Sequence, residues 1–513
     1  MAKVAVIGAG VGGMMSAARL AKYGHAVEIF ESSHRAGGKC RTEWFGDFGF
    51  DLGPSLLTIP AVFRDFFIRT GTRFENNVGL KPVDPSFRYN FSDGTILDFP
   101  NLSLPKTCEA IEKTCGKSAA DQWHNLMQRA ELMWDVARTP FIESELKPLN
   151  EILRRPGALR DLMKIAPLSS LRSYTRSLVD DERLRYIVDR YATYSGSDPR
   201  KAPAVLLTIA FIETTFGAWH LEGGVGTLAD ALLKRCIELG VQVHFNAPVS
   251  AIRTSHGSAN GIQLQTGEVI SADVVVANAD AHIVYETLIS SDVKVKSERR
   301  KLRRSTPSFS GFSLQIGIDR NKGWGPELAH HNIFFPENYD EEFDYLFQRR
   351  LPVPDPTIYI CSPQGMTKRA NAEAWSVLIN APLHATHDRN RGFDWSGYGE
   401  KYAEHIIDRM EAKGLNVRSR MEFLRIQTPQ DLENQVNAPG GSIYGTSSNG
   451  ARATFLRAKN RSPIHNLYCV GGSAHPGGGL PLVGMSAEIV AEAVQRDLTG
   501  DTNEGVRSHH GQH

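Results

Sequence analysis

The start of the chain constrains the fold most strongly, because it predicts a strand, a helix and a second strand in close succession. Residues 3–8 (KVAVIG) are continuously apolar and end in glycine, which is typical of a buried parallel strand. Val11 to Tyr23 is rich in alanine, methionine and leucine and predicts a helix that stops at Gly24. Val27 to Glu31 predicts the second strand. Together these segments predict a right-handed βαβ unit.

A glycine motif joins the first strand to the helix. Gly8, Gly10 and Gly13 fit the pattern GxGxxG, in which the glycines permit a tight turn, close approach of a pyrophosphate and close helix–strand packing. The helix N-terminus adds N–H groups and a positive dipole end. Glu31 ends the second strand, where a carboxylate accepts hydrogen bonds from a ribose diol. The combination predicts a dinucleotide site, whereas the glycines alone would also fit a purely structural turn.

A second glycine-rich stretch follows and favours FAD over NAD. Residues 35–41 (RAGGKCR) place a glycine pair between cations, and residues 50–55 (FDLGPS) come soon after. Glycine admits close backbone approach, and arginine or lysine neutralises phosphate charge, so the stretch suits an extended pyrophosphate with a ring system beyond it. The alternative for Arg35 and Arg41 is an ordinary solvated loop.

Three further glycines, Gly477 to Gly479, precede the predicted C-terminal helix, which begins near Pro481. Consecutive glycines let a backbone lie flat against a planar ligand, and proline suits the first turn of a helix. The helix N-terminus near Val483 would stabilise the electron-rich side of a reduced flavin. A flexible loop is the alternative.

Bulk properties exclude several classes of protein. Lys and Arg total 58 against 57 for Asp and Glu, which gives no reason to expect a nucleic-acid partner. The six cysteines are scattered without a CxxC pair, so neither a disulfide framework nor a metal site is expected, and a reducing cytoplasm fits best. We find no signal peptide and no apolar stretch long enough to span a bilayer.

The motifs carry a family resemblance. RAGGK (35–39) and FDLGPS (50–55) resemble the FAD-dependent amine-oxidase and carotenoid-desaturase superfamily. Other segments narrow the resemblance to bacterial phytoene-desaturase-like carotenoid oxidoreductases, in the expected order over nearly the whole chain. They are residues 217–232, 274–280, 330–335, 428–433, 438–445 and 467–487. Residues 190–196 (RYATYSG) resemble the branch that acts on hydroxylated or methoxylated acyclic carotenoids, the 3,4-desaturases.

The resemblance implies non-covalent FAD, removal of hydrogens across a C–C bond of a long isoprenoid, and attachment to the cytoplasmic face of a membrane. It also implies positions for the cofactor. By position, Glu31 would hold the adenosine ribose and Val249 would contact adenine. The residues near the pyrophosphate would be Arg35, Gly38 and Lys39, and those approaching the flavin would be Gly53, Pro54 and Ser55. The residues that close over the ribityl chain and isoalloxazine would be Gly471, Gly472, Pro481 and Val483.

The expected fold class is α/β: a Rossmann-like FAD-binding domain of the GR2 type with an inserted mixed β-sheet and a helical substrate domain. The expected parts are 1–107, 217–285 and 440–498 for the FAD-binding domain, 108–216 for a helical segment facing substrate and membrane, 286–439 for the substrate-domain sheet and helices, and 499–513 for a disordered tail.

Candidate catalytic residues lie in the helical segment. Asp161 and Lys164 match a family segment in which an acid and a cation three residues apart have been proposed as catalytic, and this spacing places them on one helix face. An exposed ion pair is the equally weighted alternative. Around them, residues 152–178 mix apolar and basic side chains, which suits an anionic membrane surface or an ordinary surface helix.

Two other functions share these motifs. A flavin amine oxidase acting on a soluble amine would need a more polar pocket with aromatic residues around the amine. A non-enzymatic isoprenoid carrier would not need FAD, and the intact glycines at both ends of the chain argue against it. The particular carotenoid, the final electron acceptor and the oligomeric state stay open.

Overall fold

The computed structural model describes residues 1–289, 295–385, 392–450 and 453–500. The predicted βαβ unit forms the centre of a five-stranded, fully parallel sheet in the order β19-β13-β1-β2-β9. Its strands are β1 (Lys3–Ile7), β2 (Ala26–Phe30), β9 (Gln242–His244), β13 (Val274–Ala277) and β19 (Leu467–Cys469). The expected tail, 499–513, lies outside the described residues from 501 onward.

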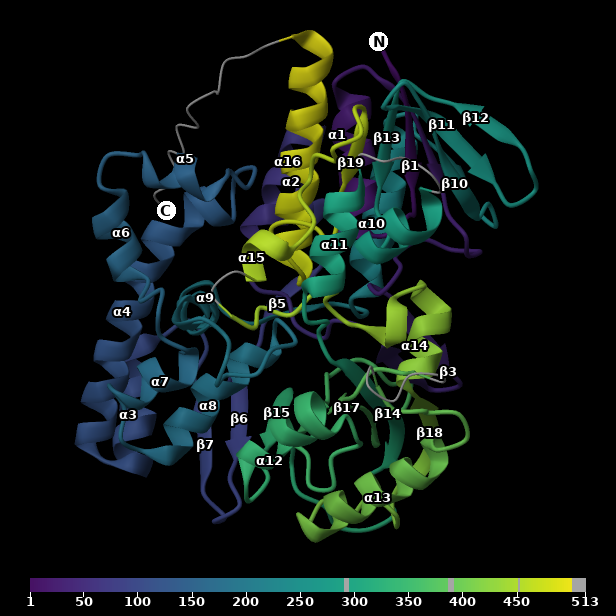
Figure 1. Ribbon diagram of the computed structural model, residues 1–513. Coiled ribbons are helices and arrows are strands. Elements are labelled where there is room, and N and C mark those ends of the chain that lie inside the picture. Colours follow the sequence, from purple (N-terminus) through teal and green to yellow (C-terminus); the bar gives the residue numbers. More distant parts are fainter. Residues whose placement is uncertain (290–294, 386–391, 451–452, 501–513) are drawn as a thin grey trace.

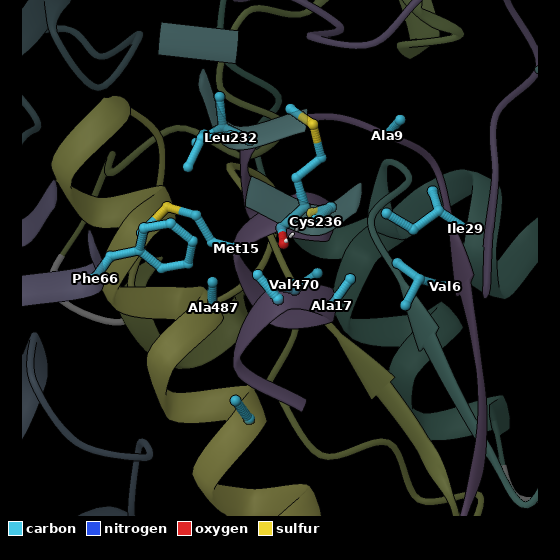
Figure 2. Close-up of a cluster of buried hydrophobic side chains, with 14 of the residues drawn as sticks. Val6, Ala9, Met15, Ala17, Ile29, Phe66, Leu232, Cys236, Val470 and Ala487 are labelled. Atoms are coloured by element: carbon cyan, nitrogen blue, oxygen red, sulfur yellow. Dashed lines mark hydrogen bonds between the residues drawn. The ribbon is translucent and has the colours of Figure 1, made fainter. Parts of the chain in front are cut away.

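Helix α1 (Val11–Lys22) is almost completely buried beneath this sheet. Figure 2 shows Met15 and Ala17 of this helix among Val6, Ile29 and Val470 from the sheet side and Ala487 from the last helix. The other helices around α1 are α2 (Ala61–Thr70), α10 (Gly226–Glu238) and α16 (Leu480–Thr499). Since β19 and α16 come from the end of the chain, the two termini of the sequence build one core.

A small antiparallel sheet lies beside this unit, and a larger mixed sheet lies below it in Figure 1. The small sheet comprises β10 (Val249–Ser255), β11 (Ser258–Leu264) and β12 (Val269–Ser271). The large sheet has the order β18 (Met421–Gln427), β14 (Ser310–Asp319), β17 (Ala372–Ala381), β16 (Ile358–Cys361), β15 (His331–Phe334), β6 (Phe87–Asn90) and β7 (Ile96–Phe99). Two strand pairs are β3 (Thr42–Phe45) with β4 (Phe48–Asp51) and β5 (Leu80–Pro82) with β8 (Trp219–Leu221).

The hairpin β6–β7 lies within residues 1–107, which we expected to belong to the FAD-binding domain, but it is part of the large sheet. It pairs with β15 in the large sheet, with Ile333 opposite Tyr89, and not with the parallel sheet. The backbone hydrogen bonds that decide this join strands more than two hundred residues apart, so local pattern alone could not show it. The other domain boundaries stay a prediction.

Helices dominate the segment between Cys108 and Phe216, as expected, and gather on one side of the molecule, drawn in blue in Figure 1. They are α3 (Leu104–Cys115), α4 (Lys117–Phe141), α5 (Leu149–Leu153), α6 (Ala158–Lys164), α7 (Leu171–Arg176), α8 (Glu182–Thr193) and α9 (Thr208–Phe216). The remaining α-helices are α11 (Lys296–Arg304), α12 (Tyr339–Asp344), α13 (Gly399–Ala412), α14 (Pro429–Val436) and α15 (Ala453–Leu456). Within the described ranges, none of the helices is long and apolar enough to cross a membrane.

Candidate active site

One large cavity of about 1160 Å³ runs from the glycine turn after β1 to the helical segment and the large sheet. At one end it is lined by Gly8, Gly10, Glu31 and Val249, which the sequence assigned to the dinucleotide. Of the cofactor residues expected from the sequence, all line this cavity except Gly13. The cavity therefore brings together segments from the start, middle and end of the chain.

The glycine turn is packed so closely that side chains would not fit. Gly8 has a φ of +91°, a left-handed conformation that favours glycine. A Cβ on Gly13 would lie 2.2 Å from the Gly8 carbonyl oxygen, so Gly13 permits α1 to approach the turn. A Cβ on Gly12 would lie 3.3 Å from the Gly471 Cα, which shows that the N-terminal turn meets the C-terminal segment directly.

Glu31 is aimed at this turn. Its carboxylate accepts hydrogen bonds from the backbone N–H of Ala9 at 2.7 Å and of Ser33 at 2.8 Å. Val249, at the start of β10, lines the cavity together with Pro248. An acid at the end of β2, beside the helix N-terminus, is the arrangement that holds a ribose next to a pyrophosphate.

Two cations, the half-buried Lys39 and the buried Arg457, line the next part of the cavity. The Lys39 Nζ donates to the carbonyl oxygens of Ser442 and Ile443 at 3.0 and 2.8 Å. Arg457 donates to the carbonyls of Tyr444, Gly472 and Thr446. Burial lowers the pKa of Lys39 to about 8 and that of Arg457 to about 10, and in each case Asp280 opposes the shift. Two cations that already have carbonyl partners and are shielded from water suit the negative charge of a pyrophosphate.

Neither Arg457 nor Asp280 was predicted as a site residue: Arg457 belongs to none of the motifs, and Asp280 ends the motif 274–280, which did not show that its side chain acts on the two cations. Arg35, which was expected near the pyrophosphate, forms an ion pair with Glu43 and also lines the cavity. Gly38 lines it nearby, with a φ of +57°. A Cβ on Gly53 would lie 1.8 Å from the Lys39 carbonyl oxygen, so the two glycine-rich stretches are in contact.

The segment after Gly53 leads toward the middle of the cavity. Ser55 shares a hydrogen bond of 2.6 Å with the Tyr359 hydroxyl, which is also 2.8 Å from the His331 Nδ1. Pro54 and Ser55 line the cavity, as do Gly471 and Gly472. Pro481 lies in the first turn of α16, and the Val483 N–H donates to the Gly479 carbonyl oxygen. These backbone-rich walls fit a planar ring system such as isoalloxazine.

Beyond this point the walls become mainly apolar. They come from α4, α6, α9 and the strands of the large sheet, and they include Phe141, Leu162, Ile165, Ile209, Ile212 and Phe309. Leu168 lines the cavity and yet is 98% exposed, so it stands at an opening to the surface. We call this mainly apolar part of the cavity the channel, and an apolar cavity that opens beside an exposed leucine suits a lipid-like substrate.

Asp161 and Lys164 lie on α6 as a partly exposed ion pair of 3.4 Å. Their neighbours Leu162 and Ile165 line the cavity, whereas neither member of the pair is among the described lining residues. The geometry therefore fits the alternative of an exposed ion pair, and the catalytic role expected for Asp161 and Lys164 stays an untested prediction.

The structure brings a different charged pair into the cavity. Arg190 of α8 and Glu213 of α9 are each only 4% exposed and both line it. The Glu213 carboxylate accepts hydrogen bonds from the hydroxyls of Tyr191 at 2.8 Å and Tyr194 at 3.0 Å. The sequence did carry one sign of this site, because Glu213 is a lone acid in the otherwise uncharged helix TIAFIETTF.

A group of potential metal ligands also lies close by. Ligand atoms of His330, His331 and Cys361 lie within 4.8 Å of one another, although no metal site was expected from the scattered cysteines. His331 is buried between Phe87 and Tyr359, at the end of the hydrogen-bonded series that begins at Ser55. Burial lowers the pKa of both imidazoles, to about 3 for His330, which favours their neutral forms.

Comparison with known proteins identifies the family to which this chain belongs. The model of the family of flavin-containing amine oxidoreductases matches residues 11–351. The chain belongs to this family, its cofactor is FAD, and it is an oxidoreductase. The expected α/β fold class is confirmed, as is the resemblance to FAD-dependent carotenoid oxidoreductases of the amine-oxidase superfamily.

Particular relatives are similar over their whole length. The 4,4'-diapolycopene oxygenase of Methylomonas sp. is 32% identical over 97% of this chain and 98% of its own. The 4,4'-diaponeurosporene oxygenase of Staphylococcus aureus is 30% identical over 96% and 97%. Among solved structures, putrescine oxidase bound to putrescine has a TM-score of 0.63 at 13% identity, covering 98% of this chain and 99% of that one, which shows the fold alone.

Proposed function

We propose that the protein is an FAD-dependent desaturase that introduces C=C bonds into an acyclic carotenoid, phytoene-like or 1-hydroxylated. The observation that carries the proposal is that one cavity is lined both by the expected dinucleotide-binding residues, with two cations, and by mainly apolar residues. The names of the 30–32% identical relatives support a polyene substrate.

In this proposal, one set of residues binds the cofactor, and the apolar walls of the cavity orient the substrate and exclude water. Glu31, Lys39 and Arg457 would hold the ribose and pyrophosphate, and the glycine segments would lie against the flavin. Bound there, FAD supplies the hydride acceptor at N5. The apolar walls from α4 and α9 orient the polyene and exclude water from the reacting carbons.

A second candidate is oxygenation of a polyene end, which the names of the two relatives favour. The test is incubation of the flavoprotein with phytoene, neurosporene and 1-hydroxylated acyclic carotenoids in liposomes. Desaturation lengthens the conjugated system and adds no oxygen, so absorbance shifts to the red while the mass falls by two hydrogens per step. A product that gains oxygen decides for the oxygenase, and no product from any polyene contradicts both candidates.

We also propose that the channel opens onto the cytoplasmic face of a membrane. Met163 is 79% and Leu168 is 98% exposed beside the cavity lining of α6. The exposed cations Arg154, Arg155 and Arg160 precede them in the sequence. Apolar side chains that insert among basic residues are typical of peripheral binding to anionic lipid.

Exchanging Met163 and Leu168 for glutamate is expected to lower flotation with anionic liposomes by at least ~10-fold, because two charges replace inserted apolar groups. Flavin content should not change. Trp324→Glu is the matched control, since Trp324 is 76% exposed elsewhere on the surface. Equal flotation of the double variant and the wild type would rule out this docking surface.

A further inference from the structure

Glu213 and Arg190 form the charged group inside the apolar channel. The Arg190 guanidinium donates to the hydroxyls of Tyr194 at 2.7 Å and Tyr89 at 3.1 Å, and lies 3.7 Å from the Glu213 carboxylate. Its carbon centre is also 4.4 Å from the centre of the Phe87 ring. Arg190 is therefore fixed by a hydrogen-bond network and by aromatic rings.

Burial of such a pair is costly. Desolvation of two charges is offset only when their geometry and their other hydrogen bonds are good, and apolar residues of similar size often stabilise a fold as well or better. Glu213 has its two tyrosine donors, whereas the Arg190 Nε is buried without a hydrogen-bond partner among the described residues. The pair is thus a costly feature of the channel wall, and stability alone does not explain it.

Glu213 lies in the wall of the proposed substrate channel. Ile209 lies one turn before it on α9, so the two side chains share a face, and both line the cavity. Tyr194, which donates to Glu213, lines the same cavity, as do Ser55 and Tyr359. The carboxylate thus belongs to the wall of the channel that joins the proposed flavin-binding segment.

We infer that Glu213 is the acid–base residue of the reaction, held in place by Tyr191, Tyr194 and Arg190. This assignment rests on the proposed desaturase function. The hydride that leaves one carbon of the polyene would be accepted by FAD, held by Glu31, Lys39 and Arg457, and the C–H bond of the adjacent carbon would break. The electron pair of that bond becomes the second bond of the new C=C, and its proton passes to the Glu213 carboxylate, which later releases it to solvent.

The ionisation of Glu213 gives the reaction a pH dependence. Burial raises the pKa of Glu213, against the opposing effects of Arg190, Tyr191 and Tyr194. Among the described residues, the groups that act on Glu213 are Arg190, Tyr191 and Tyr194, and Tyr89 and His331 act on Arg190. Only the ionised carboxylate accepts a proton, so the rate should fall as pH decreases through a pKa above the usual glutamate value of about 4.3.

The test compares Glu213→Gln with Asp161→Asn, which removes the other candidate carboxylate. Both variants are measured as purified flavoproteins with neurosporene or a 1-hydroxylated carotenoid in liposomes. We expect Glu213→Gln to keep its flavin and its polyene binding but to reduce flavin anaerobically at least ~100-fold more slowly, without the acid limb of the pH profile. Asp161→Asn should stay within about threefold of the wild-type rate, because its side chain lies on the surface of α6.

Failure of the Glu213 assignment can be distinguished from failure of the proposed desaturase function. A Glu213→Gln rate near that of the wild type overturns the assignment, and so does a loss shown only by Asp161→Asn. If Glu213→Gln does not accumulate as a folded flavoprotein, Glu213→Asp decides: a rate at least ~10-fold lower with the acid limb retained supports the assignment, and a wild-type rate overturns it. A wild-type protein that oxidises no polyene overturns the proposed function itself, before any variant is compared.

Discussion

The Gly13→Ala variant is expected to purify with little or no flavin, its affinity for FAD lowered at least ~100-fold, or about 2.7 kcal/mol. The added Cβ would lie 2.2 Å from the Gly8 carbonyl oxygen, so α1 or the turn must shift. Gly8 and Gly10 line the cavity in that turn, and a shift would displace the backbone that cradles the pyrophosphate. Flavin content after gel filtration and an FAD titration of the apoprotein measure the effect.

Gly24→Ala is the matched control at the other end of the same helix. Gly24 has a φ of +91°, so alanine is strained there, but nothing lies within 4 Å of the added Cβ. The control should lose some thermal stability and keep its flavin. If Gly13→Ala retains FAD as tightly as Gly24→Ala does, the close packing of the turn is not what shapes the site.

Ile209→Asp is expected to abolish polyene oxidation, with a loss of at least ~100-fold, while flavin content stays unchanged. Ile209 lines the apolar channel, and an unpaired carboxylate there would have to be desolvated against the substrate. The cofactor end of the cavity is built from other segments, so FAD binding should not respond. Product formation from carotenoid in liposomes and the flavin spectrum are measured on the same preparation.

The control for this variant is Thr215→Asp, which adds the same charge to the exposed side of α9. It should oxidise carotenoid at close to the wild-type rate. If Ile209→Asp oxidises carotenoid as fast as Thr215→Asp, with both near the wild-type rate, then the polyene does not pass along α9.

Local patterns were sufficient to predict the cofactor end of the molecule. The strand, glycine turn, helix and acid lie within residues 3–31 and form β1, α1 and β2 as expected. Each of these steps depends on neighbours in sequence: apolar runs for buried strands, glycine for the turn, an acid at the strand end. The C-terminal helix was predicted equally well, from Pro481 onward against an observed start at Leu480.

The groups that depend on distant contacts could not be predicted in this way. Glu213 accepts hydrogen bonds from Tyr191 and Tyr194, which come from α8 and its C-terminal end. Arg457 lines the cavity and donates a hydrogen bond to the Tyr444 carbonyl oxygen. The pairing of β6 with β15 likewise joins remote strands. Sequence did place Asp161 and Lys164 on one helix face, but only the structure shows that this face is at the surface while Leu162 lines the channel.

The central claim is that an acyclic carotenoid, and not a soluble amine, is the electron donor to this flavin. The most direct measurement mixes the purified flavoprotein anaerobically with liposomes that contain neurosporene or a 1-hydroxylated carotenoid, and separately with a soluble primary amine, while the absorbance of oxidised flavin is followed. The account predicts bleaching by the carotenoid, with a matching red shift of the polyene spectrum, and no bleaching by the amine. Bleaching by the amine, with the flavin left oxidised by every carotenoid, would contradict it.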